Sequence, residues 1–158
     1  MVMVDIGRMT GNQYATLICR YICANFGDRG ISVYTQIVLG KSIIGKDRTG
    51  DVLIVEDATR LAFVLEAKYQ SSQGTVDEKI PYTLEDLRAM RTPGCVVYAG
   101  EGFTAGILHM QRASDLAAYC LPTESVARTD QTWELDHVLA QRFGWWDIIV
   151  SDARRFKI

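Results

Sequence analysis

Two apolar runs separated by a short polar interval form the clearest hydrophobic pattern in the chain. Residues 51–56 and 61–70 have the length and composition of β-strands, and the polar residues 57–60 between them are typical of a hairpin turn. A loop centred on this interval pairs Glu56 with Leu61 and so sets the register of the two strands. The pattern therefore predicts an antiparallel hairpin.

The predicted register brings polar residues of both strands to one face. Counting outward from the turn pairs Asp51 with Glu66, and directly opposed residues share a face with their Cβ atoms about 5 Å apart. Since strand side chains alternate between faces, Lys68 and Gln70 lie on the same face as Glu66. The hairpin is therefore expected to gather two carboxylates, one ammonium group and one amide in a single patch.

Helical and strand patterns alternate along the rest of the chain. They predict helices over residues 13–26, 75–91, 103–120 and 131–143, and strands over residues 31–39 and 95–99. Residues 145–150 are expected to form a last strand or a hydrophobic contact segment. Thr75 and Glu78 have the spacing of a capping box, and Pro81 is expected to kink or split the helix that follows.

The composition is that of an ordinary globular protein. The 158 residues are 48% hydrophobic and 23% charged, with a formal net charge of −2. This length suits a single domain, 1–158, with its own hydrophobic core. The acidic balance argues against binding to nucleic acid through bulk positive charge, although an enzyme needs only a local basic surface.

Cysteine and histidine residues are too scattered for a zinc site. Cys19 and Cys23 lie one helical turn apart and are expected to pack in a core rather than to form a bridge. The others are Cys95, Cys120, His109 and His137. No apolar run reaches membrane length and the N-terminus lacks a signal-peptide profile, so the expected compartment is the cytoplasm.

The predicted patch of acids and lysine suits metal-assisted chemistry. Two opposed carboxylates repel each other unless a cation lies between them. A hard divalent ion such as Mg²⁺ binds oxygen ligands, keeps positions open for water and polarises a phosphoryl group. Lys68 on the same face would orient an attacking water or stabilise developing charge. The alternative is an edge strand with solvated charges, although Asp51 and Glu66 interrupt runs in which a sheet favours Val or Ile.

The spacing of these residues resembles the active-site pattern of a known family. Asp51, followed after a second apolar run by Glu66-x-Lys68, is similar to the motif of the PD-(D/E)XK nuclease superfamily, which has the restriction-endonuclease-like fold. The family's proline before the aspartate is Gly50 here, and Gln70 matches a Glu-x-Lys-x-Gln variant. The resemblance implies an α/β fold with a mixed central sheet of four to five strands flanked by helices, in an αβββαβ core.

The resemblance, over about residues 11–100, also implies an activity. It implies a metal-dependent DNA endonuclease that hydrolyses phosphodiester bonds in a restriction, homing or phage-type role. Asp51 and Glu66 would bind Mg²⁺, or Mn²⁺ in its place. Lys68 would position the hydrolytic water, and Gln70 would orient the water, the lysine or the phosphate. Because the chain has one such site, cutting both strands of DNA suggests a homodimer or a higher homo-oligomer.

The first predicted helix departs from the family pattern. Many members carry a metal-binding glutamate there, whereas the nearest polar residue here is Gln13, which we expect to belong to the helix cap. The missing carboxylate leaves an alternative function, a catalytically inert nuclease fold that binds nucleic acid or serves as an assembly subunit. The intact Asp/Glu/Lys trio favours the enzyme, because a carboxylate pair is costly to keep without use.

A glycine-rich loop with three cations precedes Asp51. Lys41, Lys46 and Arg48 lie within eight residues of one another, and Lys79 follows in the predicted helix 75–91. These four cations are the candidate contacts to a phosphate backbone. The alternative for the loop is a solvated hairpin tip. The loop is not a P-loop, because its glycine–lysine pair is followed by an aspartate rather than by Ser or Thr.

Overall fold

A mixed five-stranded sheet lies at the centre of the molecule, in a computed structural model that describes residues 5–158. The helices and strands are α1 (Gly11–Phe26), β1 (Ile31–Lys41), β2 (Asp47–Glu56), β3 (Ala62–Tyr69), α2 (Val76–Ala89), β4 (Gly94–Ala99), α3 (Ala105–Ala113), β5 (Ala117–Tyr119) and α4 (Trp133–Phe143). Four short 3₁₀ helices are η1 (Ile6–Arg8), η2 (Gly27–Arg29), η3 (Trp146–Ile148) and η4 (Asp152–Arg154). The predicted domain 1–158 also includes residues 1–4, which lie outside the described residues. None of the helices in the described part could cross a membrane.

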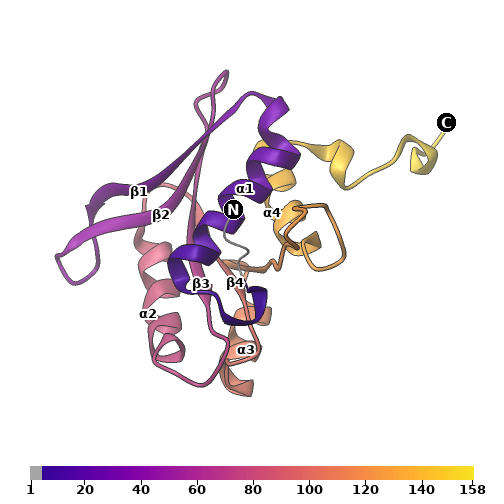
Figure 1. Cartoon of the computed structure of the whole chain (residues 1–158). Helices are drawn as coiled ribbons and strands as arrows, with labels where there is room; N and C mark the ends of the chain where they lie inside the picture. Colours follow the sequence, from indigo (N-terminus) through magenta and orange to yellow (C-terminus); the bar gives the residue numbers. More distant parts are fainter. Residues whose placement is uncertain (1–4) are drawn as a thin grey trace.

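The strands follow one another across the sheet in the order of the sequence, β1-β2-β3-β4-β5 (Figure 1). The β1–β2 and β2–β3 pairs are antiparallel, and the β3–β4 and β4–β5 pairs are parallel. Helix α2 connects the parallel strands β3 and β4, since such strands need a long connection. The predicted α/β fold class is confirmed, with its αβββαβ core and a mixed sheet flanked by helices.

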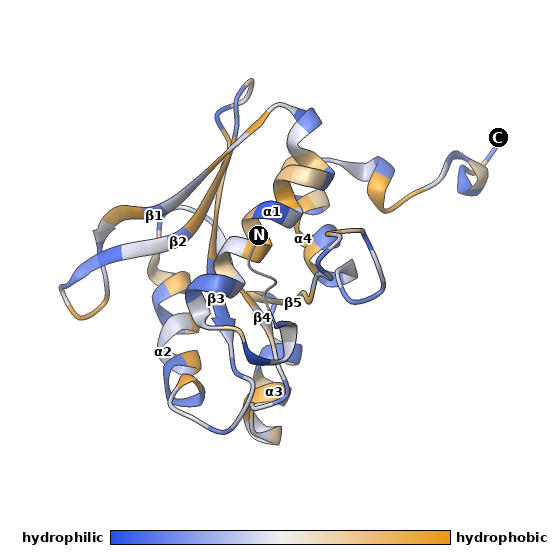
Figure 2. Ribbon diagram, in the orientation of Figure 1, coloured by the Kyte–Doolittle hydropathy of each residue, from blue (hydrophilic) through white to orange (hydrophobic). Residues whose placement is uncertain are grey.

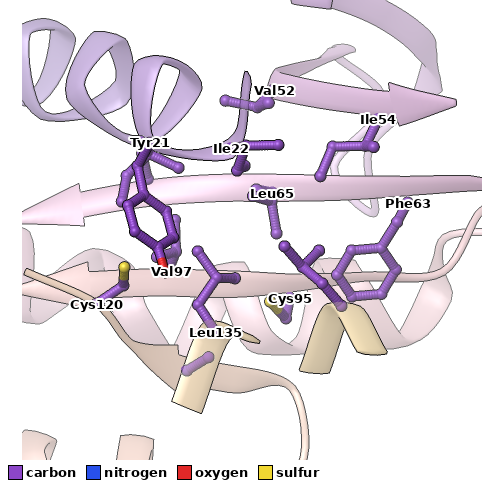
Figure 3. Packing of buried hydrophobic residues seen from close by; sticks show 14 of the residues in the cluster. Tyr21, Ile22, Val52, Ile54, Phe63, Leu65, Cys95, Val97, Cys120 and Leu135 are labelled. Atoms are coloured by element: carbon purple, nitrogen blue, oxygen red, sulfur yellow. The ribbon is translucent and has the colours of Figure 1, made fainter. Parts of the chain in front are cut away.

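Helices cover both faces of the sheet. On one face, α1 and α4 pack with inward residues of β2, β3 and β4 in the larger hydrophobic cluster (Figure 3). On the other face, α2 packs on β4 in a smaller cluster of Ile80, Leu84, Leu87, Val96 and Tyr98. Figure 2 shows hydrophilic and hydrophobic segments on both α1 and α2, as expected for helices that contact a sheet on one side and solvent on the other. Alternation along β3 buries Leu65 toward α1 and turns Glu66 and Lys68 toward α2.

Two elements in the C-terminal half differ from the prediction. The expected helix 103–120 ends at Ala113, and the three residues of β5 follow it. The expected strand at 145–150 is wrong, because this segment holds the 3₁₀ helix η3. Trp145 stacks on Phe26 and Phe143, with ring centroids 5.4 and 4.9 Å apart, so the segment is a hydrophobic contact. Trp146 is 54% exposed.

Helix α2 also differs in detail from its prediction. The capping box expected from Thr75 is absent, since this residue makes no side-chain cap bond. The backbone N–H of Val76 instead donates to Oε1 of Gln70 at 3.0 Å. Pro81 lies inside α2 without splitting it. The helix therefore depends at its start on a residue from the preceding strand segment.

The four cysteines are free, so Cys19 and Cys23 form no bridge with each other, as expected. Cys19 packs against the larger cluster. Cys23 is exposed, so the expectation that it packs in the core is wrong. The prediction therefore holds for Cys19 only. Two residues one helical turn apart lie near each other, but this spacing does not show how far the buried face of the helix extends.

Candidate active site

The hairpin of β2 and β3 has the predicted register. The N–H of Glu56 donates to the carbonyl of Leu61 at 2.9 Å, which closes the turn over residues 57–60. The opposed pairs run from Val55–Ala62 to Val52–Leu65. Continuing this register by one residue places Asp51 opposite Glu66, on the side of the sheet that faces α2.

Glu66 lies in an environment that disfavours its charge. Burial raises its pKa to about 7, and the negative charge of Asp51 acts in the same direction. Nζ of Lys68 lies 3.7 Å from Oε2 of Glu66 and partly opposes this rise. The pKa of Glu66 remains raised beside this ammonium group, mainly because the carboxyl is buried and also because Asp51 lies near it. A divalent cation bound between the two acids would favour their ionised forms.

Asp51 is fixed by the backbone of the neighbouring strand. Its Oδ2 accepts a hydrogen bond of 2.8 Å from the N–H of Ala67, beyond the last backbone pair of the hairpin. A Cβ atom on Gly50 would lie only 3.0 Å from Cγ1 of Val64. Close packing between the strands thus accounts for a glycine at the position before the aspartate.

Gln70 is bonded away from the two acids. Its Nε2 donates to Oδ1 of Asp77 and to the carbonyl of Gly102, both at 2.8 Å, while its Oε1 accepts from the N–H of Val76. The side chain is only 4% exposed. The structure therefore does not group Gln70 with Asp51, Glu66 and Lys68. The Gln70 side chain instead connects the end of β3 to the start of α2 and to the loop after β4.

The loop after β4 packs directly on the segment after β3. A Cβ on Gly100, whose φ is +106°, would lie 2.2 Å from the carbonyl oxygen of Gln70. A Cβ on Gly102 would lie 2.4 Å from the backbone nitrogen of Ser72. Only glycine fits at these two places, and the close contact explains how Gln70 reaches both segments.

A cleft of about 470 Å³ opens beside Glu66 and Lys68. Its walls come from the tip of the β1–β2 hairpin, from β3 and from α2. Lys46 and Lys79 also line it and are exposed, and Tyr82 lies beside them. Arg48 lines it as well, so the cleft joins three of the four predicted phosphate contacts to two of the candidate catalytic residues.

Two of the predicted phosphate contacts form ion pairs within the protein. Lys41 pairs with Asp47 at the exposed hairpin tip, with 2.5 Å between Nζ and Oδ1. Arg48 donates from Nε and Nη2 to the carboxylate of Asp86 on α2, each at 2.8 Å. The two side chains are 9% and 14% exposed. Arg48 therefore connects the hairpin to α2, at the wall of the cleft.

Replacing Asp86 with asparagine is expected to lower the free energy of unfolding by about 1–2 kcal/mol. The substitution leaves the mostly buried guanidinium of Arg48 without its carboxylate. Urea unfolding measures the change. Arg88→Met is a matched control on the same helix, because it removes the exposed pair with Glu85 and should cost less than about 0.5 kcal/mol. Equal losses in both variants would contradict the connection.

Helix α1 supplies no carboxylate to the site. Thr10 and Gln13 form a capping box, in which each side chain accepts from the backbone N–H of the other residue. The expectation that Gln13 belongs to the cap is confirmed. Within residues 5–158, no group of three or more His, Cys, Asp or Glu side chains is placed to hold a metal. Asp51 and Glu66 therefore remain the acidic pair, and their hard oxygen atoms suit Mg²⁺ or Mn²⁺.

Sequence reasoning missed three residues that shape the site. Asp77 holds Gln70 across the turn between β3 and α2, seven residues away in the chain, and Asp86 holds Arg48 from 38 residues away. Neither helix nor strand periodicity predicts these two contacts. Gln36 of β1 places its Nε2 3.5 Å from Oδ1 of Asp51. To place Gln36 near Asp51 from the sequence, one would have needed the register between β1 and β2.

A comparison with protein-family models agrees with the motif. A family model described as a PD-(D/E)XK nuclease superfamily domain matches residues 10–146. A comparison with curated protein sequences gives no match. Among solved structures, a repair endonuclease from Pyrococcus abyssi is similar at 15% sequence identity and a TM-score of 0.39. The match covers 65% of this chain and 44% of that one, so the present chain spans less than half of the solved protein.

Proposed function

The chain belongs to the PD-(D/E)XK nuclease superfamily, and from this premise we propose that it is a metal-dependent endonuclease that hydrolyses phosphodiester bonds in DNA. The observation that carries the proposal is the arrangement of Asp51, Glu66 and Lys68 at one end of the β2–β3 hairpin, beside the cleft. A restriction, homing or phage-type role is compatible with this site.

Asp51 and Glu66 would hold the metal ion. The raised pKa of Glu66 is consistent with this assignment, because a carboxyl that is mostly buried and lies near the charge of Asp51 would be stabilised in its ionised form by a bound cation. The register places the two side chains opposite each other on neighbouring strands, so their carboxylate oxygens could bind one ion together. A bound Mg²⁺ or Mn²⁺ would polarise the scissile phosphate.

Lys68 would orient the attacking water. Its ammonium group lies on the face of Glu66, is 21% exposed, and lines the cleft from which a phosphate would approach. A compact cation with three donors can hold a water and also stabilise charge on the phosphate as the bond breaks. Gln70 would have an indirect, positioning role. Its bond to Val76 holds the start of α2, the helix that carries Lys79.

The DNA backbone would follow the cleft. Lys46 and Lys79 are exposed cations that line it, the first from the hairpin tip and the second from α2. Lys41 would contact a phosphate only if it left its ion pair with Asp47. Arg48 would mainly hold the wall of the cleft in place through its ion pair with Asp86. This small basic surface agrees with a net charge of −2, since binding would rest on local cations and the metal ion.

Cleavage of both strands would require two such sites. One chain holds one group of Asp51, Glu66 and Lys68, so we propose a homodimer whose two-fold axis relates the sites to the two strands. Size-exclusion chromatography with light scattering tests the oligomeric state. A protein that stays monomeric with DNA and metal would be expected to nick one strand.

The purified protein is expected to convert supercoiled plasmid to nicked and linear forms with Mg²⁺ or Mn²⁺, and to lose this activity in EDTA. Gel electrophoresis over time measures the products. A protein that shifts DNA in a gel but leaves plasmid intact with either metal would contradict the proposal. That result would support the inert nuclease-fold subunit instead.

A further inference from the structure

Three polar side chains form a row across the first three strands. Gln36 of β1 lies opposite Asp51 of β2, which in turn lies opposite Glu66 of β3. The backbone pairs on either side of the first two are Thr35–Val52 and Ile37–Gly50. The contact between its side chain and Asp51 places Gln36 beside the acidic pair.

The backbone of Gln36 is held in an unusual conformation. Its φ of +55° lies in the left-handed region, which costs a non-glycine residue about 1–3 kcal/mol. The other described non-glycine residues with positive φ, Arg60 and Val126, lie in a turn and a loop, whereas Gln36 lies inside a strand. Its side chain is exposed, so core packing does not explain the conformation.

The side chain of Gln36 instead reaches toward Asp51. Its Nε2 lies 3.5 Å from Oδ1, while the other carboxylate oxygen, Oδ2, accepts from the N–H of Ala67. The amide of Gln36 therefore contacts the oxygen of Asp51 that does not accept from the backbone of Ala67. A half-turn about the terminal torsion of glutamine exchanges its nitrogen and oxygen, so the same position can present either a donor or an acceptor.

Resting on the proposed function, we propose that Gln36 is a third side chain of the metal site, beside Asp51 and Glu66. Its amide oxygen would bind the divalent cation, and its N–H would face Asp51 when no cation is present. An amide oxygen is a hard, neutral ligand of the kind that Mg²⁺ and Mn²⁺ accept. It would add a ligand to a site to which α1 contributes no carboxylate.

Binding of Mn²⁺ measured by isothermal titration calorimetry tests the assignment without reference to cleavage. Gln36→Ala is expected to weaken Mn²⁺ binding about tenfold. Gln36→Glu, which keeps an oxygen and adds a charge, is expected to bind Mn²⁺ at least as tightly as the wild type. Gln131→Ala, which alters an exposed glutamine just before α4, should leave the affinity for Mn²⁺ unchanged.

Gln36→Gly keeps the test valid if the alanine variant does not fold. Glycine adopts the left-handed conformation freely, so this variant removes the amide while relieving the backbone. It should also lose about tenfold in affinity, with circular dichroism confirming the fold.

The outcomes separate the two proposals. A wild type that binds no Mn²⁺, or an Asp51→Asn variant that binds it as tightly as the wild type, would refute the metal site itself. Mn²⁺ binding that is lost in Asp51→Asn but unchanged in Gln36→Ala and Gln36→Gly would overturn the role of Gln36 alone. Weaker binding in Gln36→Glu than in Gln36→Ala would overturn it as well.

Discussion

Lys68→Met is expected to slow plasmid cleavage by about 10²–10⁴-fold, the range for loss of a group that orients and stabilises the reacting atoms. Methionine keeps most of the length of the side chain and removes only the charge and its donors. The ammonium group lies 3.7 Å from Glu66 in the cleft, and no other lysine makes an ion pair with either acid among residues 5–158. Single-turnover rates with excess protein measure the chemical step without the contribution of DNA binding.

Lys79→Met is the matched control for that experiment. Lys79 lines the same cleft but is exposed on α2, so its loss should weaken DNA binding several-fold and leave the single-turnover rate nearly unchanged. Both variants are best compared at alkaline pH with saturating Mn²⁺, since Lys68 also lowers the pKa of Glu66. Equal rate losses in the two variants would show that Lys68 contributes only to the charge of the cleft.

The hairpin that carries the acids was predictable because its register follows from one short turn. The polar residues 57–60 fix the pairing of Glu56 with Leu61, and a one-residue slip would move every apolar residue to the wrong face. The same counting places Asp51 opposite Glu66. Sequence therefore located the acidic pair without knowledge of the helices around it.

The surroundings of the acids were not predictable in this way. The bond from Arg48 to Asp86 joins residues 38 positions apart, and neither strand nor helix periodicity relates them. Gln70 shares a face with Lys68 by alternation, yet it lies just after β3, where the chain turns toward α2 and alternation no longer applies. For Gln36, the left-handed backbone is the informative feature, and glutamine gives no signal of it.

The short strand β5 shows a second reason why part of the fold was not predicted from the sequence. It has only three residues, Ala117–Tyr119, and its apolar side chains extend the spacing of α3. Three residues are too few to display period-two alternation. Pairing with β4 creates this strand, so the information lies in the tertiary contact rather than in the segment.

Glu66→Gln is expected to make the metal-free protein more stable at about pH 8, by on the order of 2 kcal/mol. The pKa of Glu66 is about 7 in the folded protein, against an ordinary value of 4.5. Below the ordinary value the carboxyl is protonated in both states, and its contribution to stability is fully present. As the pH rises through the folded pKa that contribution is lost, on the order of 3 kcal/mol in all. Glutamine cannot ionise and avoids this loss, although Lys68 then lacks its partner, which offsets part of the gain.

Urea unfolding between about pH 5 and pH 8 measures the effect, and the advantage of Glu66→Gln should disappear toward the acidic end. Glu85→Gln, at an exposed carboxylate on α2, should show no such dependence. Saturating Mn²⁺ should reduce the difference in free energy of unfolding between Glu66→Gln and the wild type at about pH 8. A ligand that binds only the folded state stabilises it, and the wild type keeps both acids that would bind the ion. A Glu66→Gln protein that is less stable than the wild type at about pH 8 would mean that the folded protein already neutralises Glu66. A divalent cation at this place would then have no electrostatic basis, because a neutralised pair of acids needs no further positive charge.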